Sequence, residues 1–232
     1  FDDIDMMIMQ HTSTTENGDE AGKIKGNCGG STGLGFMGKL VRYIGKEAHA
    51  GGAPHLGINA LNAAQIGLMA VNANRETFQD KDHIRVHPII TKGGDLVNVV
   101  PADVRIETYV RGANVDAILD ASAKVSRAFK AGADAVGAKC EITDLPGYLP
   151  TIQNYDLFDI MYENMKEVFG DEKFVRYENT AGGGSTDAGD ISYLMPMIHS
   201  YFIGAEGIGH SENYEIADKD IAYIAAAKCL AM

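Results

Sequence analysis

The sequence predicts an α/β protein in which one domain is inserted into another. Residues 36–145 read in the order strand, helix, strand, strand, helix, strand, which is typical of the ferredoxin-like βαββαβ unit. The segments on either side, 1–35 and 146–232, alternate strands and helices of their own. The chain of 232 residues is long enough for two domains of ordinary size. We therefore expect an antiparallel sheet with two helices on one face, inserted into a second α/β domain.

The elements of the inserted domain follow from the spacing of apolar residues. Apolar positions recur at helical spacing in two long segments and alternate in shorter ones. In chain order we expect a strand over 36–46, a helix over 59–74, strands over 83–91 and 104–110, a helix over 115–136 and a strand over 139–143. Gly93 and Gly94 are expected to form the turn between the two central strands.

The flanking segments are expected to form the other domain. We expect strands over 6–10, 174–177 and 198–203, and helices over 154–169 and 217–232. Asn154 is a suitable N-cap for the first of these helices. Asp218 and Asp220 stand in the first turn of the last helix, where the helix dipole favours acidic residues. Residues 12–35 are polar and rich in glycine, so we expect a loop there.

The composition argues against several classes of function. The chain is 45% hydrophobic and 22% charged, as in ordinary globular proteins, and its formal net charge is -12. That charge argues against nucleic acid or an anionic membrane as a partner. No apolar run reaches the roughly 18 residues that a membrane-spanning helix needs. Cys28, Cys140 and Cys229 are widely spaced, which predicts no disulfide framework and favours the cytoplasm.

Two histidines follow predicted strands of the flanking domain. His11 ends the strand at 6–10, and His210 lies in the loop GIGHSENYEIAD after the strand at 198–203. Loops at strand ends of α/β domains carry binding residues, and imidazole is the commonest metal ligand among side chains. Taken singly, each histidine is more typical of a structural or surface residue. Two ligands also do not complete a catalytic zinc site, which needs about three from the protein.

A glycine-rich segment, AGGGSTDAGD at 181–190, precedes the His210 loop. Gly183 and Gly184 would let a ligand approach the backbone closely, and Ser185 adds a hydroxyl group. A plain tight turn is the alternative interpretation. A phosphate-binding loop is disfavoured, because the segment lacks the GK[ST] ending and has no lysine nearby.

The inserted domain offers three further candidates. His49, in KEAHAGGAPH, is flanked by small residues and could donate a hydrogen bond to a developing oxyanion. Asn98 precedes the predicted strand at 104–110, and Arg111 follows it. An amide with a guanidinium group suits recognition of a carboxylate, although Arg111 alone is more typical of a solvated strand end. Structural roles are expected for the histidines His55, His83, His87 and His199.

Four segments together resemble a known family. In order and spacing, KEAHAGGAPHLGINALNAA, GGDLVNVVPADVRIETYVRG, GGGSTDAGDISYLMP and GHSENYEIAD are similar to the dinuclear-zinc aminoacylase and carboxypeptidase family of metallopeptidases. STDAGDIS and FDDID…H look most like the amidohydrolase branch that includes p-aminobenzoyl-glutamate hydrolase and hippurate hydrolase. The resemblance implies a zinc-peptidase-like catalytic domain at 1–35 and 146–232. It also implies a ferredoxin-like lid at 36–145 that dimerises.

The resemblance implies a metal-dependent amidohydrolase or peptidase that cleaves an amide bond of an N-acyl amino acid or a small peptide-like substrate. Two ions, zinc or manganese, are implied, with His11 and His210 each a ligand to one of them. His49 would reach the active site of the neighbouring protomer in a homodimer and bind the scissile carbonyl oxygen. The residues implied to bind the substrate are Asn98, Arg111 (on its carboxylate), Gly183, Gly184 and Ser185.

The sequence departs from the family in one large respect. The remaining ligands of the family are an HxD-type histidine, a bridging acidic residue or cysteine, and a ligand next to the general-base glutamate. All normally lie upstream of the FDDID segment, and none is present. Because the first residue is Phe1 and not Met, we expect that an N-terminal part is missing. The alternative function is a catalytically incomplete fragment that acts only as a dimerisation or binding module.

Overall fold

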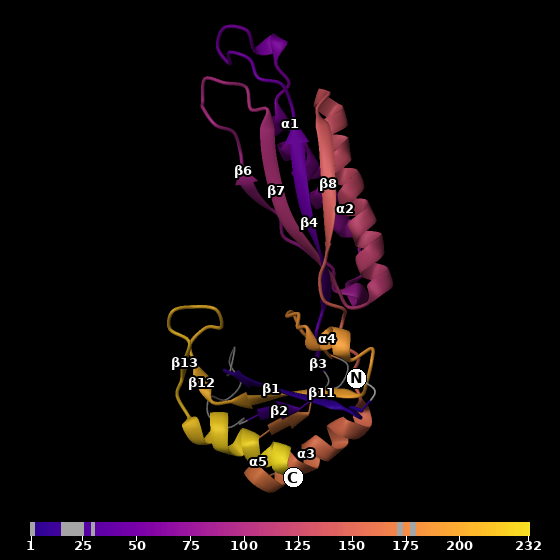
Figure 1. Cartoon of the computed structure of the whole chain (residues 1–232), viewed down its shortest axis with the longest axis vertical. Coiled ribbons are helices and arrows are strands. Elements are labelled where there is room, and N and C mark those ends of the chain that lie inside the picture. Colours follow the sequence, from indigo (N-terminus) through magenta and orange to yellow (C-terminus); the bar gives the residue numbers. More distant parts are fainter. Residues whose placement is uncertain (1–2, 15–25, 29–30, 171–173, 177–179) are drawn as a thin grey trace. The chain divides into compact units, whose positions relative to one another are not determined.

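The computed structural model describes residues 3–14, 26–28, 31–170, 174–176 and 180–232. The chain divides into two compact units (Figure 1). The inserted unit is Leu34–Pro150, and the discontinuous unit combines Phe1–Gly33 with Thr151–Met232. Both units mix helices and strands, so the predicted α/β class is confirmed. Separate folding of the predicted domains 36–145 and 1–35 with 146–232 stays a prediction.

The inserted unit is an antiparallel sheet with two helices on one face (Figure 1). In spatial order the strands are β5 (Arg85–Val86), β7 (Asp103–Gly112), β4 (Gly35–Ile44) and β8 (Lys139–Pro146), with β6 (Ile89–Lys92) also pairing with β7. The helices are α1 (Ala60–Ala73) and α2 (Val115–Val136). This is the order expected of a ferredoxin-like unit.

Local sequence explains these elements. Val41 and Ile106 are paired across β4 and β7, and both are buried beneath the helices, as the period of two requires. Asn59 caps α1 by accepting hydrogen bonds from two backbone N–H groups of the first turn, and Asn114 caps α2 by accepting one, from the N–H of Ala117. Gly132 lets α1 and α2 approach closely, because a Cβ there would lie 2.3 Å from the carbonyl oxygen of Ala63.

One charged side chain lies in the core of the inserted unit. Lys39 on β4 is fully buried, and its Nζ donates to Asp144 Oδ1 at 2.5 Å and to Ser126 Oγ at 2.9 Å. Asp144 is half-exposed. The ammonium group is therefore paired from β8 and from α2, which satisfies a buried charge.

The prediction of one continuous strand over 83–91 is wrong. The segment is divided into β5 and β6, with His87 and Pro88 between them. Proline has no N–H group to donate to a ladder, so the pairing with β7 is interrupted there. β8 continues three residues beyond the predicted end at residue 143.

The discontinuous unit is built on a four-stranded sheet. In spatial order its strands are β1 (Met7–Ser13), β11 (Met197–Ile203), β2 (Gly26–Cys28) and β9 (Phe174–Arg176). β1 pairs with β11 in parallel, and β2 pairs with β11 in antiparallel. One face is covered by α3 (Tyr155–Phe169) and α5 (Ala226–Ala231), and the short helix α4 (Ala188–Ile191) lies over the other (Figure 1).

Short pairings and a modified last helix complete this unit. β3 (Ser31–Thr32) pairs with β10 (Thr180–Ala181), and β12 (Ala205–Glu206) pairs with β13 (Glu215–Ile216). The last helix begins with a π-helical turn at Asp220–Ala225 that leads into α5. The predicted helix start at 217 is therefore too early, and Asp218 instead accepts a 3.0 Å hydrogen bond from the N–H of Ile221.

Two expectations for the N-terminal region are corrected. The strand predicted over 6–10 is β1, which extends through His11 to Ser13 and is a half-exposed strand at the edge of the described sheet. The loop predicted over 12–35 contains β2 and β3, because pairing with β11, β9 and β10 decides strands this short. Across the described ranges, no helix is long and apolar enough to cross a membrane.

Candidate functional site

A cavity of about 190 Å³ opens in the discontinuous unit beside β1 and β11, next to the loop that leads into α4. Its lining residues are Met9, His11, Gly33, Gly182, Gly184, Ser185, Thr186, His199 and Tyr201. Three predicted site residues, His11, Gly184 and Ser185, thus share one cavity. Gly183 lies in the same loop but does not line it. A Cβ at Gly183 or Gly184 would meet no atom within 4 Å, so this part of the loop borders open space.

Strand pairing explains why the rings meet there. In the parallel ladder, Met9 is opposite His199 and His11 is opposite Tyr201. These alternate residues project from the same face of the sheet. The ring of His11 lies 5.9 Å from that of His199 and 6.1 Å from that of Tyr201. The histidine predicted from its place at a strand end is therefore part of an aromatic group of three.

The hydrogen bond of His11 to the backbone of Thr12 indicates which ring nitrogen carries the proton in the neutral imidazole. Its Nδ1 lies 3.1 Å from the carbonyl oxygen of Thr12. A carbonyl only accepts, so Nδ1 carries the proton in this hydrogen bond. The lone pair of the neutral ring is then on Nε2, which is the arrangement that metal-ligating histidines adopt.

His199 was expected to be structural, and the structure places it in the cavity. Its side chain is buried, and its Nε2 has no hydrogen-bond partner among the described residues. Burial, with a smaller contribution from His11, lowers the pKa of His199 to about 4, so the ring is neutral near pH 7. The signal in the sequence was its place two residues before Tyr201 in an alternating strand. That pattern alone does not say which face carries the site.

His210 lies in the loop between β12 and β13, where it is exposed and has φ of 65°. The loop is tied to β1, since the hydroxyl of Tyr214 donates a 2.9 Å hydrogen bond to the carbonyl oxygen of Thr12. Within the residues that the structure describes, no ring contact or hydrogen bond joins His210 to His11. In the same residues no group of three or more His, Cys, Asp or Glu side chains is placed to hold a metal ion. The role of His210 stays a prediction.

The inserted unit brings His49 and Asn98 together. The N–H of Ala50 donates to the carbonyl of Asn98 at 2.9 Å, and His49 forms a β-bridge with Val99. The N–H of Gly52 donates to Nδ1 of His49 at 2.9 Å. Because Nδ1 accepts, the neutral ring carries its proton on Nε2, which is a free donor on an exposed side chain. An N–H donor of this kind is the group that stabilises an oxyanion in many enzymes, and the role of His49 stays a prediction.

Arg111 lies at the opposite end of β7 from Asn98. Asp103 begins the strand and Arg111 is eight residues further on, which corresponds to roughly 27 Å of extended chain. The guanidinium group lies 5.7 Å from the ring centres of both Phe36 and Tyr109. Within one chain, Asn98 and Arg111 therefore do not converge on one ligand.

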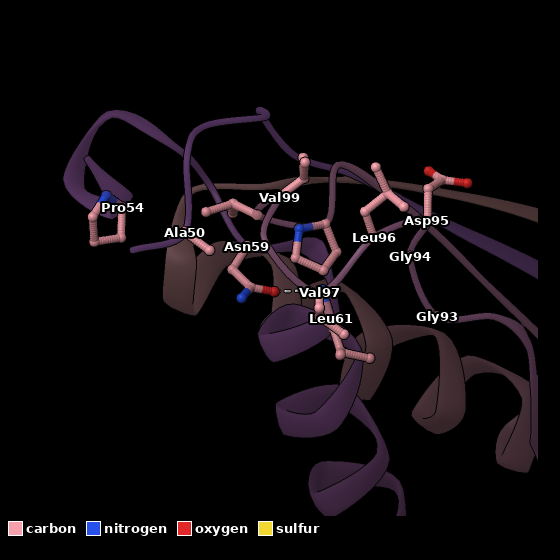
Figure 2. A pocket seen from close by; sticks show the side chains of 12 residues that line it. Ala50, Pro54, Asn59, Leu61, Gly93, Gly94, Asp95, Leu96, Val97 and Val99 are labelled. Carbon is pink, nitrogen blue, oxygen red and sulfur yellow. Dashed lines mark hydrogen bonds between the residues drawn. The ribbon is translucent and has the colours of Figure 1, made fainter. Parts of the chain in front are cut away.

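A second cavity, of about 520 Å³, lies beside the His49 segment (Figure 2). Its walls come from residues 50–61 and 93–101 and are mainly apolar, with Leu96 and Val97 on the outer loop. The side-chain oxygen of Asn59 is used to cap α1 and accepts from the N–H of Leu61. Asp95 is the one ionisable residue among those that line it. The carboxylate of Asp95 is paired with Nζ of Lys92 at 3.1 Å, so we assign no acid–base role to this cavity.

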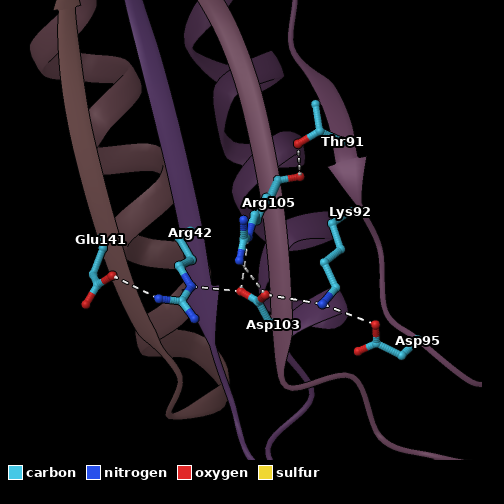
Figure 3. A network of polar contacts seen from close by, with 7 residues as sticks. All are labelled: Arg42, Thr91, Lys92, Asp95, Asp103, Arg105 and Glu141. Atoms are coloured by element: carbon cyan, nitrogen blue, oxygen red, sulfur yellow. Dashed lines mark hydrogen bonds and ion pairs between the residues drawn. The ribbon is translucent and has the colours of Figure 1, made fainter.

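The open face of the inserted sheet carries a network of charges (Figure 3). Asp103 accepts hydrogen bonds from Arg42 at 2.8 Å, from Arg105 at 3.0 Å and from Lys92 at 3.3 Å. These bonds, that from Arg42 foremost, hold the pKa of Asp103 well below its usual range. Asp95 and Glu141 also pair with this network. The basic and acidic side chains of this network pair with one another, so we interpret its role as structural: it holds β4, β6 and β7 together.

The chain is similar to known peptidases and to an aminobenzoyl-glutamate hydrolase homolog. Residues 34–136 match the model of the peptidase dimerisation domain. The chain is 34% identical over 200 residues to Xaa-Arg dipeptidase of Mus musculus, across 83% of this chain and 46% of that protein. It is 30% identical over 195 residues to carboxypeptidase G2 of Pseudomonas sp., across 82% and 44%. A homolog of p-aminobenzoyl-glutamate hydrolase from Haemophilus influenzae is 39% identical over 74 residues, across 32% and 17%.

The chain spans about half the length of the curated relatives that it matches over most of its own length. Solved structures share the fold. A putative aminohydrolase from methicillin-resistant Staphylococcus aureus has a TM-score of 0.75 at 19% identity, across 99% of this chain and 58% of that one. A dinuclear metal-binding peptidase of the M20 family from Bacillus subtilis has a TM-score of 0.69 at 16% identity, across 98% and 56%. Residues 34–136 are therefore an M20 peptidase dimerisation domain, and the relatives of the chain are a dipeptidase, a carboxypeptidase and an aminobenzoyl-glutamate hydrolase homolog, which agrees with the resemblance found in the sequence.

Proposed function

We propose that this chain forms part of a metal-dependent amidohydrolase or peptidase that cleaves an amide bond of an N-acyl amino acid or a small peptide-like substrate. The observation that carries the proposal is His11, whose Nδ1–H is bound to the Thr12 carbonyl so that Nε2 is left as a ligand beside the glycine-rich loop. Relatives named as a dipeptidase, an aminobenzoyl-glutamate hydrolase and a carboxypeptidase support the same class of reaction.

We propose two bound ions, zinc or manganese, with His11 and His210 each a ligand to one of them. His11 fits this role through its tautomer, and the described residues supply only part of a complete ligand set. Such ions polarise an amide carbonyl and lower the pKa of a bound water. Ser185 and the backbone of Gly183 and Gly184 would line the substrate cleft, and the cavity beside His11 supports this for Gly184 and Ser185.

The polar groups of the inserted unit would bind and orient the substrate. The Nε2–H of His49 would donate to the carbonyl oxygen as negative charge develops on it, and Asn98 lies on the neighbouring segment. Arg111 would bind the substrate carboxylate. Because Arg111 is some eight residues along β7 from its start, one substrate can contact all three residues only if two protomers contribute them. This supports a homodimer in which His49 serves the partner's site.

The edge strand β6 is our candidate for the dimer contact. It pairs with β7 on one side only, and Ile89 and Ile90 are 62% and 43% exposed. The nearby side chains of Leu96 and Val97 are also exposed. The other edge, β8, presents exposed charged residues, which discourage strand pairing. An apolar open edge is suited to pairing with a second copy.

The test of the catalytic proposal is metal content together with hydrolysis. Purified chain is incubated with Zn²⁺ or Mn²⁺ at neutral pH, desalted and analysed for metal, and N-acyl amino acids and dipeptides are supplied as substrates. We expect bound metal that His11→Ala and His210→Ala abolish. Metal well below one ion per protomer, without hydrolysis, would favour the second candidate function, a dimerisation or binding module. The match over residues 34–136 is the observation that favours that candidate.

We also propose a reducing, cytoplasmic location. The thiols of Cys140 and Cys229 are both free, which is typical of proteins kept in a reducing compartment. Mass spectrometry after alkylation of the native protein from its source would test this location, since an oxidised pair would contradict it.

A further inference from the structure

One backbone carbonyl connects the two predicted metal ligands. The oxygen of Thr12 accepts from Nδ1 of His11 at 3.1 Å and from the hydroxyl of Tyr214 at 2.9 Å. A carbonyl oxygen has two lone pairs, so both hydrogen bonds can be made at once. Tyr214 is separated from Thr12 by 202 positions in the chain but follows His210 by only four.

The loop that carries His210 is closed by its own hydrogen bonds. The N–H and hydroxyl of Ser211 both donate to the carbonyl of Ile208, and the N–H of Tyr214 donates to the carbonyl of Ser211 at 3.2 Å. At the base of the loop, Gly207 has φ of 87°, and a Cβ there would lie 2.0 Å from the carbonyl oxygen of Asn213. His210 and Tyr214 therefore belong to one compact turn, and what holds Tyr214 also holds His210.

The Tyr214 hydroxyl is the link from this turn to β1. Between described residues, it is the only hydrogen bond that joins positions 207–214 to β1. Tyr214 is 36% exposed and has no ring contact with a described aromatic residue, so burial of its ring does not account for a tyrosine here. The hydroxyl oxygen is the atom of Tyr214 with a specific partner.

We propose that Tyr214 is a positioning residue that holds the His210 turn against the His11 end of β1, so that both imidazoles face one site for divalent transition-metal ions. The metal part of this inference rests on the proposed function, whereas the positioning part rests on the hydrogen bonds alone. Because Thr12 also orients His11, loss of the phenolic oxygen would separate the two ligand-bearing segments without removing either ligand. Groups that orient ligands typically contribute 10- to 100-fold to metal affinity.

The test is Tyr214→Phe in the intact chain, a change of one oxygen atom. Tyr223→Phe is the matched control, because Tyr223 is an exposed tyrosine in the same unit whose hydroxyl has no hydrogen bond to a described residue. Hydrogen exchange of the metal-free protein is measured first. We expect the amides of residues 205–217 to exchange at least about tenfold faster in Tyr214→Phe, with the melting temperature and the control unchanged. Equal exchange in Tyr214→Phe and wild type would overturn the positioning role.

Metal binding is measured second, with Zn²⁺ followed by the ring resonances of His11 and His210 and with Co²⁺ followed by its visible absorption. We expect both rings to respond at the same Zn²⁺ concentration in wild type, and Tyr214→Phe to weaken Co²⁺ binding roughly tenfold. If exchange rises in Tyr214→Phe but neither ring of the wild type responds to Zn²⁺, the positioning role stands and the metal site of the proposed function fails. If the rings respond but Tyr214→Phe binds Co²⁺ as wild type does, the metal site stands and the inference fails.

Discussion

The ring of His199 stacks on that of Tyr201, with centroids 4.4 Å apart and planes at 28°. The hydroxyl of Tyr201 lies 3.4 Å from Nδ1 of His199, whereas Nε2 is buried and has no partner in the part of the chain that the structure describes. An unsatisfied buried polar atom lowers the free energy of unfolding by about 1–3 kcal/mol. The stability of the fold therefore does not explain why a histidine occupies position 199.

Replacement of His199 by phenylalanine tests that cost. The ring and its stacking on Tyr201 are kept while the unpaired nitrogen is removed, so we expect His199→Phe to raise the free energy of unfolding by about 1 kcal/mol. His199→Ala is the contrasting variant, and it should lower stability because it leaves a cavity. Urea denaturation of the metal-free chain gives both values. A less stable His199→Phe would mean that the hydrogen bonds of the His199 ring, including that between Nδ1 and the hydroxyl of Tyr201, outweigh the cost of burying Nε2.

The acid sensitivity of the metal-free chain should depend on the same residue. The pKa of His199 is about 4 in the folded state and about 6.5 when unfolded, so the unfolded state binds more protons between these values. The contribution of neutral His199 to the free energy of unfolding is therefore present in full above pH 6.5 and is lost as the pH falls towards 4. We expect a loss of about 2 kcal/mol at pH 5. Urea midpoints at pH 7.5 and 5.0 measure it, and His199→Phe should show the smaller difference.

The buried pair of Lys39 and Asp144 should be asymmetric in its response to mutation. Asp144→Ala leaves the buried ammonium group of Lys39 without its charged partner, and we expect the free energy of unfolding to fall by about 3 kcal/mol. This is the lower end of the usual range, because water can reach the half-exposed position of Asp144. Lys39→Met leaves only an exposed carboxylate and should cost less than about 1 kcal/mol. Thermal or urea unfolding compares the two. Equal losses would show that the charge on Lys39 is not the cause.

Under the proposed function, His49→Phe should reduce catalysis in the active enzyme. It removes the Nε2–H that Gly52 leaves free to donate, and loss of one oxyanion donor typically lowers kcat by about 10²–10³. We expect KM to change little, since the bond strengthens mainly in the transition state. His55→Phe, an exposed histidine in the same segment, is the matched control. A similar kcat for the two variants would remove His49 from the mechanism.

A charge on the open edge of the inserted unit should prevent dimerisation. Ile89→Lys places an ammonium group on β6, where we propose that two copies meet. We expect light scattering at micromolar concentration to show a dimer for wild type and a monomer for this variant. Leu119→Lys, at a similarly exposed position on α2, should remain dimeric. A dimeric Ile89→Lys would place the contact elsewhere, and a monomeric wild type would contradict the dimer itself.

The sequence determined the long elements because their signals are local. The helix predicted over 115–136 is α2 with the same limits, and the helix predicted over 154–169 differs from α3 only by its N-cap, Asn154. Apolar spacing and capping side chains act within a few turns, so they can be read without the fold. The order of strands and helices in the inserted unit followed from the same signals, whereas the family was indicated by the resemblance of four sequence motifs.

Only the tertiary structure decided which side chains share the site. The two-residue strands β12 and β13 exist through their pairing, and the break between β5 and β6 depends on how β7 accommodates Pro88. His199 looked like any residue of a buried strand until the parallel register with β1 placed it beside His11. The bond from Tyr214 to Thr12 spans 202 positions, and no local pattern encodes it. Chain periodicity fixes which face a residue occupies, whereas the packing of distant segments fixes what that face meets.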